Sequence, residues 1–330
     1  MSVAVVTESG VDTVSFAFRP QGRDWFDAVE CFRAKAHRHG AAGSLIADSR
    51  PADGGRLLAF PAHGALVVES RLAAMLAGSE NDHALCALDR LPVGAEVARR
   101  VLAAHLDVDP GDHVEVRRSD LAAGLRFKAA ADGIAFLRGV ASMTAPRLVT
   151  TIWKAVDGVP MTVYFKTPRR GAVVARIYDK GRESGCDPPG EHVRIEVQVR
   201  PPKSQRQSPQ VVATEDHRER FGRVMSSYTG AELTVAGPDG AVAELAARAV
   251  RGELTHAKAE RLIGSVALLK HGGRAVYDRA DGDRKVNDRR SSRRIKALRD
   301  AGISLDEALP ASALIPVTGL LREAIERFAS

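Results

Sequence analysis

The segment Thr162–Arg200, with the sequence TVYFKTPRRGAVVARIYDKGRESGCDPPGEHVRIEVQVR, decides the expected fold. Three short runs in it are rich in Val, Ile, Tyr and Phe and are bounded by Pro or Gly, which is the pattern of adjacent strands. These runs are Thr162–Lys166, Ala172–Lys180 and His192–Arg200. In the third run every second residue from Val193 to Val199 is apolar, so we expect one buried face and one face open to water.

The wet face of this sheet is expected to carry a phenol, a carboxylate and guanidinium groups, from Tyr178, Glu196, Arg176 and Arg194. A nucleophilic oxygen, an oxygen ligand for a divalent metal and cations for phosphate charge together suit chemistry on a phosphodiester. The plain alternatives are a packed strand tyrosine and a solvated carboxylate paired with Arg194. Asp179 faces away from Tyr178 on an unbroken strand, so both reach one site only if the strand ends or bulges there.

Composition sets the broad class of the protein. The chain has 330 residues, 45% of them hydrophobic, and a formal charge of +7, which is compatible with a nucleic-acid partner without requiring one. Cys31, Cys86 and Cys186 lie far apart, which argues against a zinc site or a disulfide framework. No secretory signal pattern and no apolar run near the ~20 residues of a membrane span is present, so a soluble cytoplasmic protein is expected.

The remaining chain predicts an α+β fold: an antiparallel-sheet region with flanking helices, followed by a mainly helical region. Strands are expected at Val11–Phe18, Arg56–Phe60, Ala65–Glu69 and Val114–Phe127, with helices at Arg23–His39 and Ala95–Leu106. After the proline-rich loop Pro201–Gln210 the pattern becomes helical, at Glu215–Ser227, Gly240–Arg251, Thr255–Lys270, Asn287–Ala301 and Leu314–Phe328. We therefore expect residues 1–210 to form the sheet-rich catalytic region and residues 211–330 a helical, basic region for binding DNA or a partner.

Two further features bear on function. Asp12 shares strand parity with Val14, Phe16 and Phe18, so its carboxylate is expected among apolar neighbours, where it needs a ligand or a strand-end role. The run Arg284–Arg299 holds eight basic residues against one acid, Asp288, and a helix this one-sided is expected to contact a polyanion. No phosphate-binding loop of the Gly-x4-Gly-Lys-Ser/Thr type exists in the sequence, so ATP hydrolysis is not expected.

Several segments resemble, in order, the replication initiation factors of rolling-circle plasmids, filamentous phages and actinobacterial mobile elements, the Rep_trans type. The specific part is TVYFKTPRRGAVVARIYDKGRESG (Thr162–Gly185) with the closing strand VRIEVQVR (Val193–Arg200), which is similar to the signature block of that family. One departure is Lys166-Thr167-Pro168-Arg169, where the family usually has Gly-Ser-Arg. Weaker similarity extends over VDTVSFAF (Val11–Phe18), LVVESRLAAMLAGSEN (Leu66–Asn81), VRRSDLA (Val116–Ala122) and SSRRIKALRDAGISL (Ser291–Leu305).

The resemblance implies a metal-dependent DNA nicking-closing enzyme that initiates rolling-circle replication. Tyr178 would attack a phosphodiester at the origin and form a 5′-phosphotyrosyl link, assisted by Arg176 and Lys180. A Mg²⁺ or Mn²⁺ ion would be held by carboxylates, and origin DNA by basic side chains. It also implies a host helicase and polymerase as partners, and homodimers in some members. The expected metal ligands are Asp179, Glu196, Asp120 and Asp12, and the expected DNA-binding residues are Arg194, Arg169, Arg289, Arg290, Arg293, Arg294 and Lys296.

Three other readings remain open on the sequence. A non-enzymatic DNA-binding regulator would use the basic helix at Asn287–Ala301 and would not need Tyr178. A tyrosine recombinase would use a His-x-x-Arg box, such as His217 with Arg220 or His271 with Arg274, and a later nucleophile such as Tyr277. A structural protein of a mobile element would show no salt-sensitive DNA binding.

Overall fold

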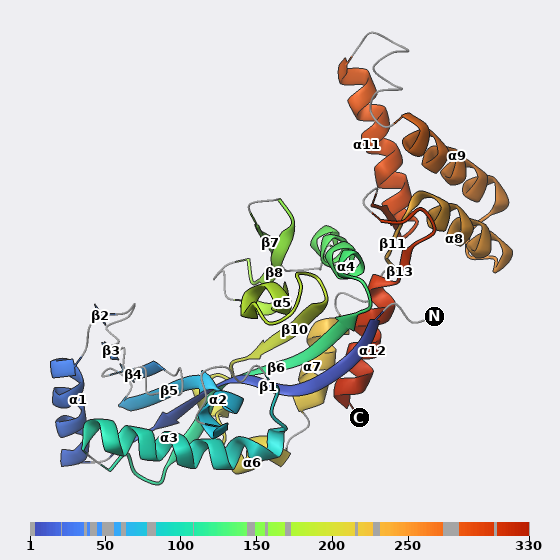
Figure 1. Cartoon of the computed structure of the whole chain (residues 1–330). Helices are drawn as coiled ribbons and strands as arrows, with labels where there is room; N and C mark the ends of the chain where they lie inside the picture. The colour runs from blue at the N-terminus through green and yellow to red at the C-terminus, as the bar shows by residue number, and fades with distance from the viewer. Residues whose placement is uncertain are drawn as a thin grey trace.

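The computed structural model is an α+β protein built on one large sheet (Figure 1). It describes residues 4–20, 22–35, 38–39, 45–47, 56–60, 64–77, 84–107, 109–143, 149–155, 158–168, 173–214, 217–226, 232–272, 284–306 and 309–329. The ten-stranded sheet has the order β2-β3-β4-β5-β1-β6-β10-β9-β8-β7, and every neighbouring pair is antiparallel. Its strands are β1 (Ala4–Phe18), β2 (Arg38–His39), β3 (Leu45–Ala47), β4 (Arg56–Phe60), β5 (Ala65–Arg71), β6 (Val114–Phe127), β7 (Val149–Lys154), β8 (Pro160–Lys166), β9 (Val173–Asp179) and β10 (His192–Val199).

The apolar residues of the central strands pack with helices into one main core. Val193, Ile195 and Val197 of β10 lie beside Leu121 and Leu125 of β6, and all five are fully buried. Period-2 alternation sends these side chains to one face, where burying them drives the sheet and helices together. The helices α3 (Leu91–Leu106), α4 (Ala130–Ser142), α7 (His217–Ser226) and α12 (Val317–Ala329) contribute side chains to this core.

The remaining helices of this body are shorter or lie at its edges. Figure 1 shows α1 (Arg23–Lys35) at one end of the sheet, beside β2 and β3. The others are α2 (Leu72–Ala77), α5 (Lys180–Ser184) and α6 (Pro209–Thr214). None of the described helices is both long enough and apolar enough to cross a lipid bilayer.

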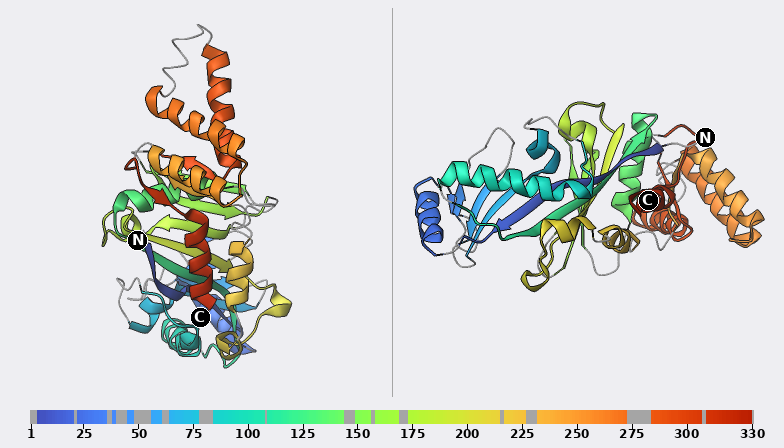
Figure 2. Two further views of the ribbon diagram at one scale, coloured as in Figure 1. Left: turned by 90° about the vertical axis from the view of Figure 1, so that its right-hand side faces the viewer. Right: turned by 90° about the horizontal axis from the view of Figure 1, so that it is seen from below.

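A second, smaller core builds an arm that projects from the body (Figures 1 and 2). The arm contains α8 (Pro238–Val250), α9 (His256–Gly272), α11 (Arg284–Asp300) and the small sheet β12-β11-β13, formed by β11 (Thr234–Ala236), β12 (Ile303–Leu305) and β13 (Leu314–Ile315). Leu245, Leu262 and Leu298 pack together in it. Arg138 of α4 donates to Asp306 at 2.8 Å, which ties the arm to the body.

Packing crosses the predicted division at residue 210. Both α7 and α12 follow that point in the chain, yet Phe221 and Phe328 stack at 4.5 Å between ring centroids inside the main core. The second core instead involves residues 236–305 together with Leu314. The arm is therefore an insertion between two helices of the body, and residues 211–330 are divided between both cores.

Most predicted elements of the signature block are confirmed. The three runs form β8, β9 and β10, which are neighbours in the sheet as expected. The prediction that one face of β10 lies open to water is wrong, however, because every residue of β10 except Gln198 is buried. The sequence prediction also missed α4, α6, β2, β3, β7 and the three strands of the arm, and its helix Arg23–His39 extended over β2.

Candidate active site

Cross-strand register brings the polar residues of the signature block together on one face. Tyr178 lies opposite Arg194, and Arg176 lies opposite Glu196, in the β9–β10 pair. Residues directly opposite each other in an antiparallel pair have Cβ atoms about 5 Å apart, so these four side chains form one cluster. The predicted combination of a phenol, a carboxylate and guanidinium groups is thus assembled by the strand pairing alone.

Within this cluster Tyr178 is bonded to a buried ion pair. The Tyr178 hydroxyl donates to Glu196 Oε1, and Arg176 Nε donates to Glu196 Oε2 at 2.5 Å. The Arg176 guanidinium also lies over the Tyr178 ring, 4.8 Å from its centroid. Tyr178 is 2% exposed and Glu196 is fully buried, while the Arg176 side chain keeps 24% exposure. The tyrosine therefore has a carboxylate acceptor on its hydroxyl and a cation against its ring.

Burial is the main cause of the shifted pKa values of Glu196 and Tyr178. Removal from water raises the pKa of Glu196 to about 7, reinforced by the nearby Asp12 and only partly offset by Arg176. Burial, together with Glu196 and Asp12, also raises the pKa of Tyr178 well above its ordinary value. A phenol of this kind does not ionise spontaneously near neutral pH, and it needs a base to take its proton. Glu196 is hydrogen-bonded to that proton and titrates in the range that suits a general base.

Asp179, expected together with Glu196 as a metal ligand, does not join the cluster. It lies opposite Val193, on the other face from Tyr178, because successive residues of a strand alternate. At the end of β9 its Oδ1 accepts from the backbone N–H of Arg182 at 2.9 Å and caps α5. Its carboxylate thus has a structural role that the sequence prediction missed.

Lys180 is placed beside the tyrosine by the turn into α5. Its Nζ lies 5.7 Å from the centroid of the Tyr178 ring and donates to Glu183 at 2.6 Å. Lys180 is 2% exposed, whereas the Glu183 side chain is 39% exposed. The predicted proximity of Lys180 to Tyr178 is therefore present, with its charge shared with Glu183.

Arg194 is the centre of a second, buried charge network. Its two terminal nitrogens donate to Asp12 at 2.9 Å and to Glu8 at 2.7 Å, and the residue is fully buried. His192 lies 3.3 Å from the same Glu8 oxygen. Gly124 makes room for this network, because a Cβ there would meet Glu8 Cγ at 2.7 Å. A buried guanidinium that faces two carboxylates is not presented to a phosphate, so the expected DNA contact of Arg194 does not fit its position.

Asp12 also departs from its predicted surroundings. Strand parity placed it with Val14 and Phe16, whose side chains enter the apolar core, yet its carboxylate reaches Arg194 on the polar face. The β1–β6 register shifts between Val11 and Val14, and such a bulge reverses the alternation locally. The prediction that Asp12 points toward apolar residues is therefore wrong.

Of the four predicted metal ligands, Asp12 interacts electrostatically with both Asp120 and Glu196, whereas Asp179 lies on the other face of the sheet. Asp12 and Glu196 are bonded to arginines as described, and Asp120 accepts from Arg118 Nε at 2.7 Å, while Asp179 caps α5. Burial raises the pKa of Asp120, with Arg118 opposing. Among the described residues, no three His, Cys, Asp or Glu side chains are arranged to hold a metal ion. The donor set as placed does not fit Mg²⁺ or Mn²⁺, which require several oxygen ligands.

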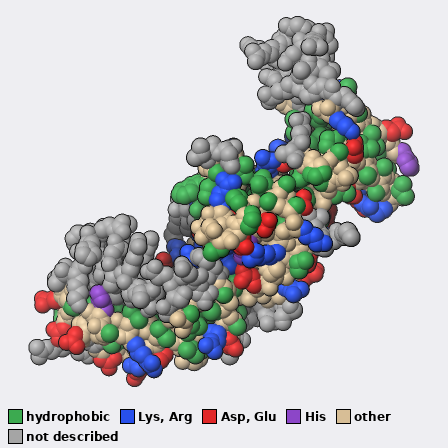
Figure 3. All heavy atoms as spheres, viewed as in Figure 1, with side chains coloured by type: hydrophobic (Ala, Val, Ile, Leu, Met, Phe, Trp, Pro, Cys, Tyr) green, Lys and Arg blue, Asp and Glu red, His purple; other side chains and the backbone are tan. Residues whose placement is uncertain are grey.

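The predicted DNA-binding residues of the basic run lie on α11, in the arm. Of the side chains described there, Arg293 and Lys296 are exposed and Arg294 is half-buried, while Leu298 anchors the helix in the arm. The side chains of Arg289 and Arg290 and the whole of Arg169 lie outside the described residues. Figure 3 shows Lys and Arg intermixed with acidic side chains over the visible face rather than gathered in one patch.

Sequence reasoning missed Glu8, the partner of Arg194 and His192. A usable signal was present, since Ala4 and Val6 continue the alternation of β1 toward the N-terminus and place Glu8 within a strand rather than before one. The burial of Glu8 raises its pKa, but hydrogen bonds and charge interactions with His192 and Arg194 outweigh this effect and lower the pKa to about 2. Alternation alone would place Glu8 on the apolar face with Ala4 and Val6, and the register shift between Val6 and Glu8 turns its side chain to the polar face.

Comparison with known proteins gives a limited result. No protein-family model matches the chain, and no curated protein matches it. A solved structure that is similar to it is the rolling circle replication initiator protein from Geobacillus stearothermophilus, at 15% identity and a TM-score of 0.37. The match covers 67% of this chain and 85% of that one. At this identity and TM-score the similarity establishes neither a family nor an activity for the present chain.

Proposed function

We propose that the protein is a DNA nicking-closing enzyme of the rolling-circle initiator kind, with Tyr178 as its nucleophile. The observation that carries this proposal is the hydrogen bond from the Tyr178 hydroxyl to the fully buried Glu196, with Arg176 bonded to the same carboxylate. The resemblance of the signature block supports the choice of origin DNA as substrate. An α+β fold alone would be compatible with many other activities.

The chemistry is a reversible transfer of a phosphodiester from an alcoholic oxygen to a phenolic oxygen. The Tyr178 oxygen attacks the phosphorus, a new P–O bond forms, and the bond to the 3′ oxygen breaks with its electron pair. Glu196 takes the phenolic proton, and the departing 3′ oxygen takes a proton from solvent. Because the 5′-phosphotyrosyl ester conserves the bond energy, a later 3′-hydroxyl can reverse the step and restore Tyr178 without ATP.

Arg176 is the cation best placed to meet the phosphate. Its side chain is 24% exposed and lies against the Tyr178 ring, so it can hold a phosphate oxygen while remaining bonded to Glu196. Tyr178 is only 2% exposed, so binding of DNA must open the cluster enough to admit a phosphate. Lys180, on the adjoining helix α5, is part of what covers its ring.

The described carboxylates as placed do not form a site for Mg²⁺ or Mn²⁺, so an ion that polarises the phosphate would have to bind together with the DNA. A host helicase and polymerase, and a homodimer, would complete the initiator role that the sequence resemblance implies.

The proposal is tested by incubating the purified protein with labelled single-stranded DNA from the element's own origin region, with Mg²⁺, Mn²⁺ or EDTA. A covalent protein–DNA adduct on a denaturing gel is the expected result, and its loss in EDTA would establish the metal requirement. Salt-sensitive DNA binding without any adduct across the whole region would instead favour the non-enzymatic regulator.

We expect the cleavage rate to depend on the ionisation of Glu196. Its pKa of about 7 means that the carboxylate accepts a proton only above that pH. Single-turnover rates should therefore fall about tenfold for each pH unit below 7 and level off above it. Glu196→Gln should cut the rate about 10²-fold and remove this dependence. Glu219→Gln, at a side chain that is 68% exposed, is the matched control and should leave the profile unchanged.

The basic helix should contribute affinity rather than catalysis. Replacing Arg293, Lys296 and Arg299 of α11 together by Ala should lower the slope of log K against log salt by up to about 3, since each lost phosphate contact removes close to one unit. Substitution is preferred to truncation, because a cut before α11 would also remove α12 from the main core. Arg100→Ala with Arg223→Ala, at exposed positions of the body, is the control. An unchanged slope would exclude the helix from binding.

A further inference from the structure

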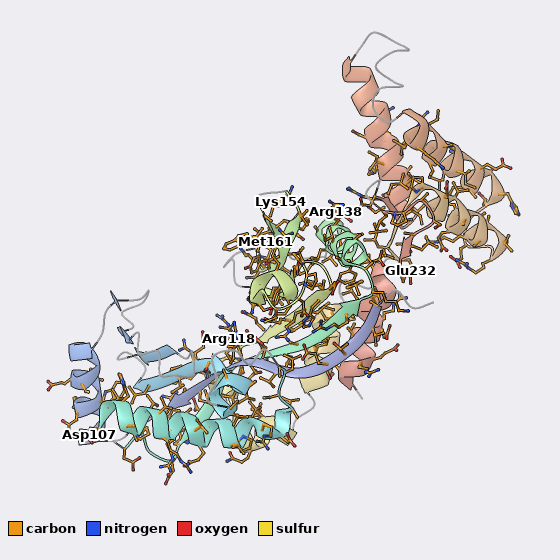
Figure 4. The ribbon with its side chains drawn as sticks, in the orientation of Figure 1. Asp107, Arg118, Arg138, Lys154, Met161 and Glu232 are labelled. Carbon is orange, nitrogen blue, oxygen red and sulfur yellow. The ribbon has the colours of Figure 1, made fainter. Side chains whose placement is uncertain are left out.

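An exposed aromatic surface lies on the polar face of the sheet at its β7 edge. Trp153 of β7 is 64% exposed, and its ring meets that of Tyr164 edge-on at 5.8 Å between centroids. Lys166 Nζ lies 5.2 Å from the centre of the Tyr164 ring. The position is marked by the labels Lys154 and Met161 in Figure 4, at the ends of β7 and β8. We call Trp153, Tyr164 and Lys166 the aromatic platform.

Register connects the platform to the candidate active site. Trp153 lies opposite Thr162, and Thr162 lies opposite Tyr178, so these three residues form one row across β7, β8 and β9. The neighbouring row runs from Tyr164 to Arg176. Adjacent strands are about 4.8 Å apart, so the backbone of Trp153 is ~10 Å from that of Tyr178. Small, half-buried Thr162 is the residue of β8 between them.

The exposure of Trp153 argues against a purely structural role. A tryptophan stabilises a fold through the area that it buries, and most of this side chain remains in water. Val149, on the same face of this edge strand, is also 48% exposed. An exposed tryptophan beside a half-buried tyrosine that carries a cation above its ring is instead a composition suited to single-stranded nucleic acid, where bases stack on rings and cations meet the backbone.

We propose that the aromatic platform holds single-stranded DNA beside the reacting phosphate, by stacking bases on Trp153 and Tyr164. This inference rests on the proposed function, since it places the substrate of that same site. Lys166 supplies charge complementarity to the backbone, and the partly exposed Arg176 continues it toward Tyr178. Because every base has an aromatic face, the platform binds without regard to sequence, and origin recognition lies elsewhere in the protein.

Tryptophan fluorescence tests the platform without depending on cleavage. The chain has two tryptophans, so Trp25→Phe leaves Trp153 as the only one. Titrating this variant with an oligo(dT) strand should quench its emission, because the indole stacks on a base. Fluorescence anisotropy of a labelled oligo(dT) should show that Trp153→Ala binds at least about tenfold more weakly than wild type. Trp153→Phe should restore most of the lost affinity, because it keeps an aromatic ring. Val149→Ala is the control on the same strand and face.

The outcomes separate this inference from the proposed function. Adduct formation at Tyr178 with no quenching, and with Trp153→Ala within twofold of wild type, would overturn the platform and leave the nickase intact. Quenching of Trp153, together with weaker oligo(dT) binding by Trp153→Ala, would support the platform. If the same protein forms no adduct, the proposed cleavage chemistry is wrong and the platform still stands. Equal circular dichroism and urea midpoints for Trp153→Ala and wild type are required as evidence that the fold is intact.

Discussion

Tyr178→Phe is expected to abolish formation of the protein–DNA adduct and to lower strand cleavage by at least about 10³-fold. The substitution removes the attacking oxygen and keeps the ring against Arg176, so the loss falls on chemistry rather than on folding. DNA binding, measured by anisotropy on the same strand, should change by less than about threefold.

Tyr228→Phe is the control, since it removes a phenol outside the signature block. It should keep the adduct at wild-type yield. If Tyr178→Phe still forms the adduct, the nucleophile lies elsewhere. A loss of cleavage in a Tyr277→Phe variant alone would point to the recombinase reading, at a residue outside those that the structure describes.

Arg194→Ala should have the largest effect on stability, at about 3–5 kcal/mol of unfolding free energy. The guanidinium is fully buried, and its removal leaves Asp12, with a side chain only 5% exposed, and Glu8 without their cation. Asp12 then remains buried without its ion pair, and Glu8 keeps only His192 beside it. Urea unfolding at neutral pH, with equal slopes for both proteins, provides the measurement.

Two further variants test whether the lost stability comes from the buried charges or from removing any arginine. Arg100→Ala, at a side chain that is 75% exposed on α3, should cost less than about 0.5 kcal/mol. Combining Asp12→Asn with Arg194→Met should recover part of the loss, since it removes one of the stranded charges and refills the space. A loss below about 1 kcal/mol for Arg194→Ala would mean that the network is more hydrated than its burial indicates.

The strands of the signature block were predictable because each alternates and each is bounded by Pro or Gly. Their alternation also gave the faces correctly, and hence the meeting of Tyr178, Arg176 and Glu196. Alternation does not predict how far each side chain is buried from water. Glu196 was expected in water and is fully buried, with Tyr178 and Arg176 bonded to its two oxygens.

The errors at Asp12 and in α4 have different physical causes. A bulge adds one residue to a strand and inverts the faces beyond it, and nothing in the sequence around Val11–Val14 marks it. The helix α4 carries Gly133 and Gly139, which weaken a local helix signal. Both glycines lie where a Cβ would collide, with the Gly190 carbonyl oxygen at 1.8 Å and with Val235 Cγ2 at 2.6 Å, so tertiary packing selects them.

The position of α12 has a consequence for the order of events during synthesis. This helix follows the arm in the chain, yet Leu321 and Phe328 are part of the main core. A nascent chain that has already exposed Tyr178 and the entire arm still lacks one wall of that core. We therefore expect the packing of the large sheet to remain incomplete until α12 has left the ribosome.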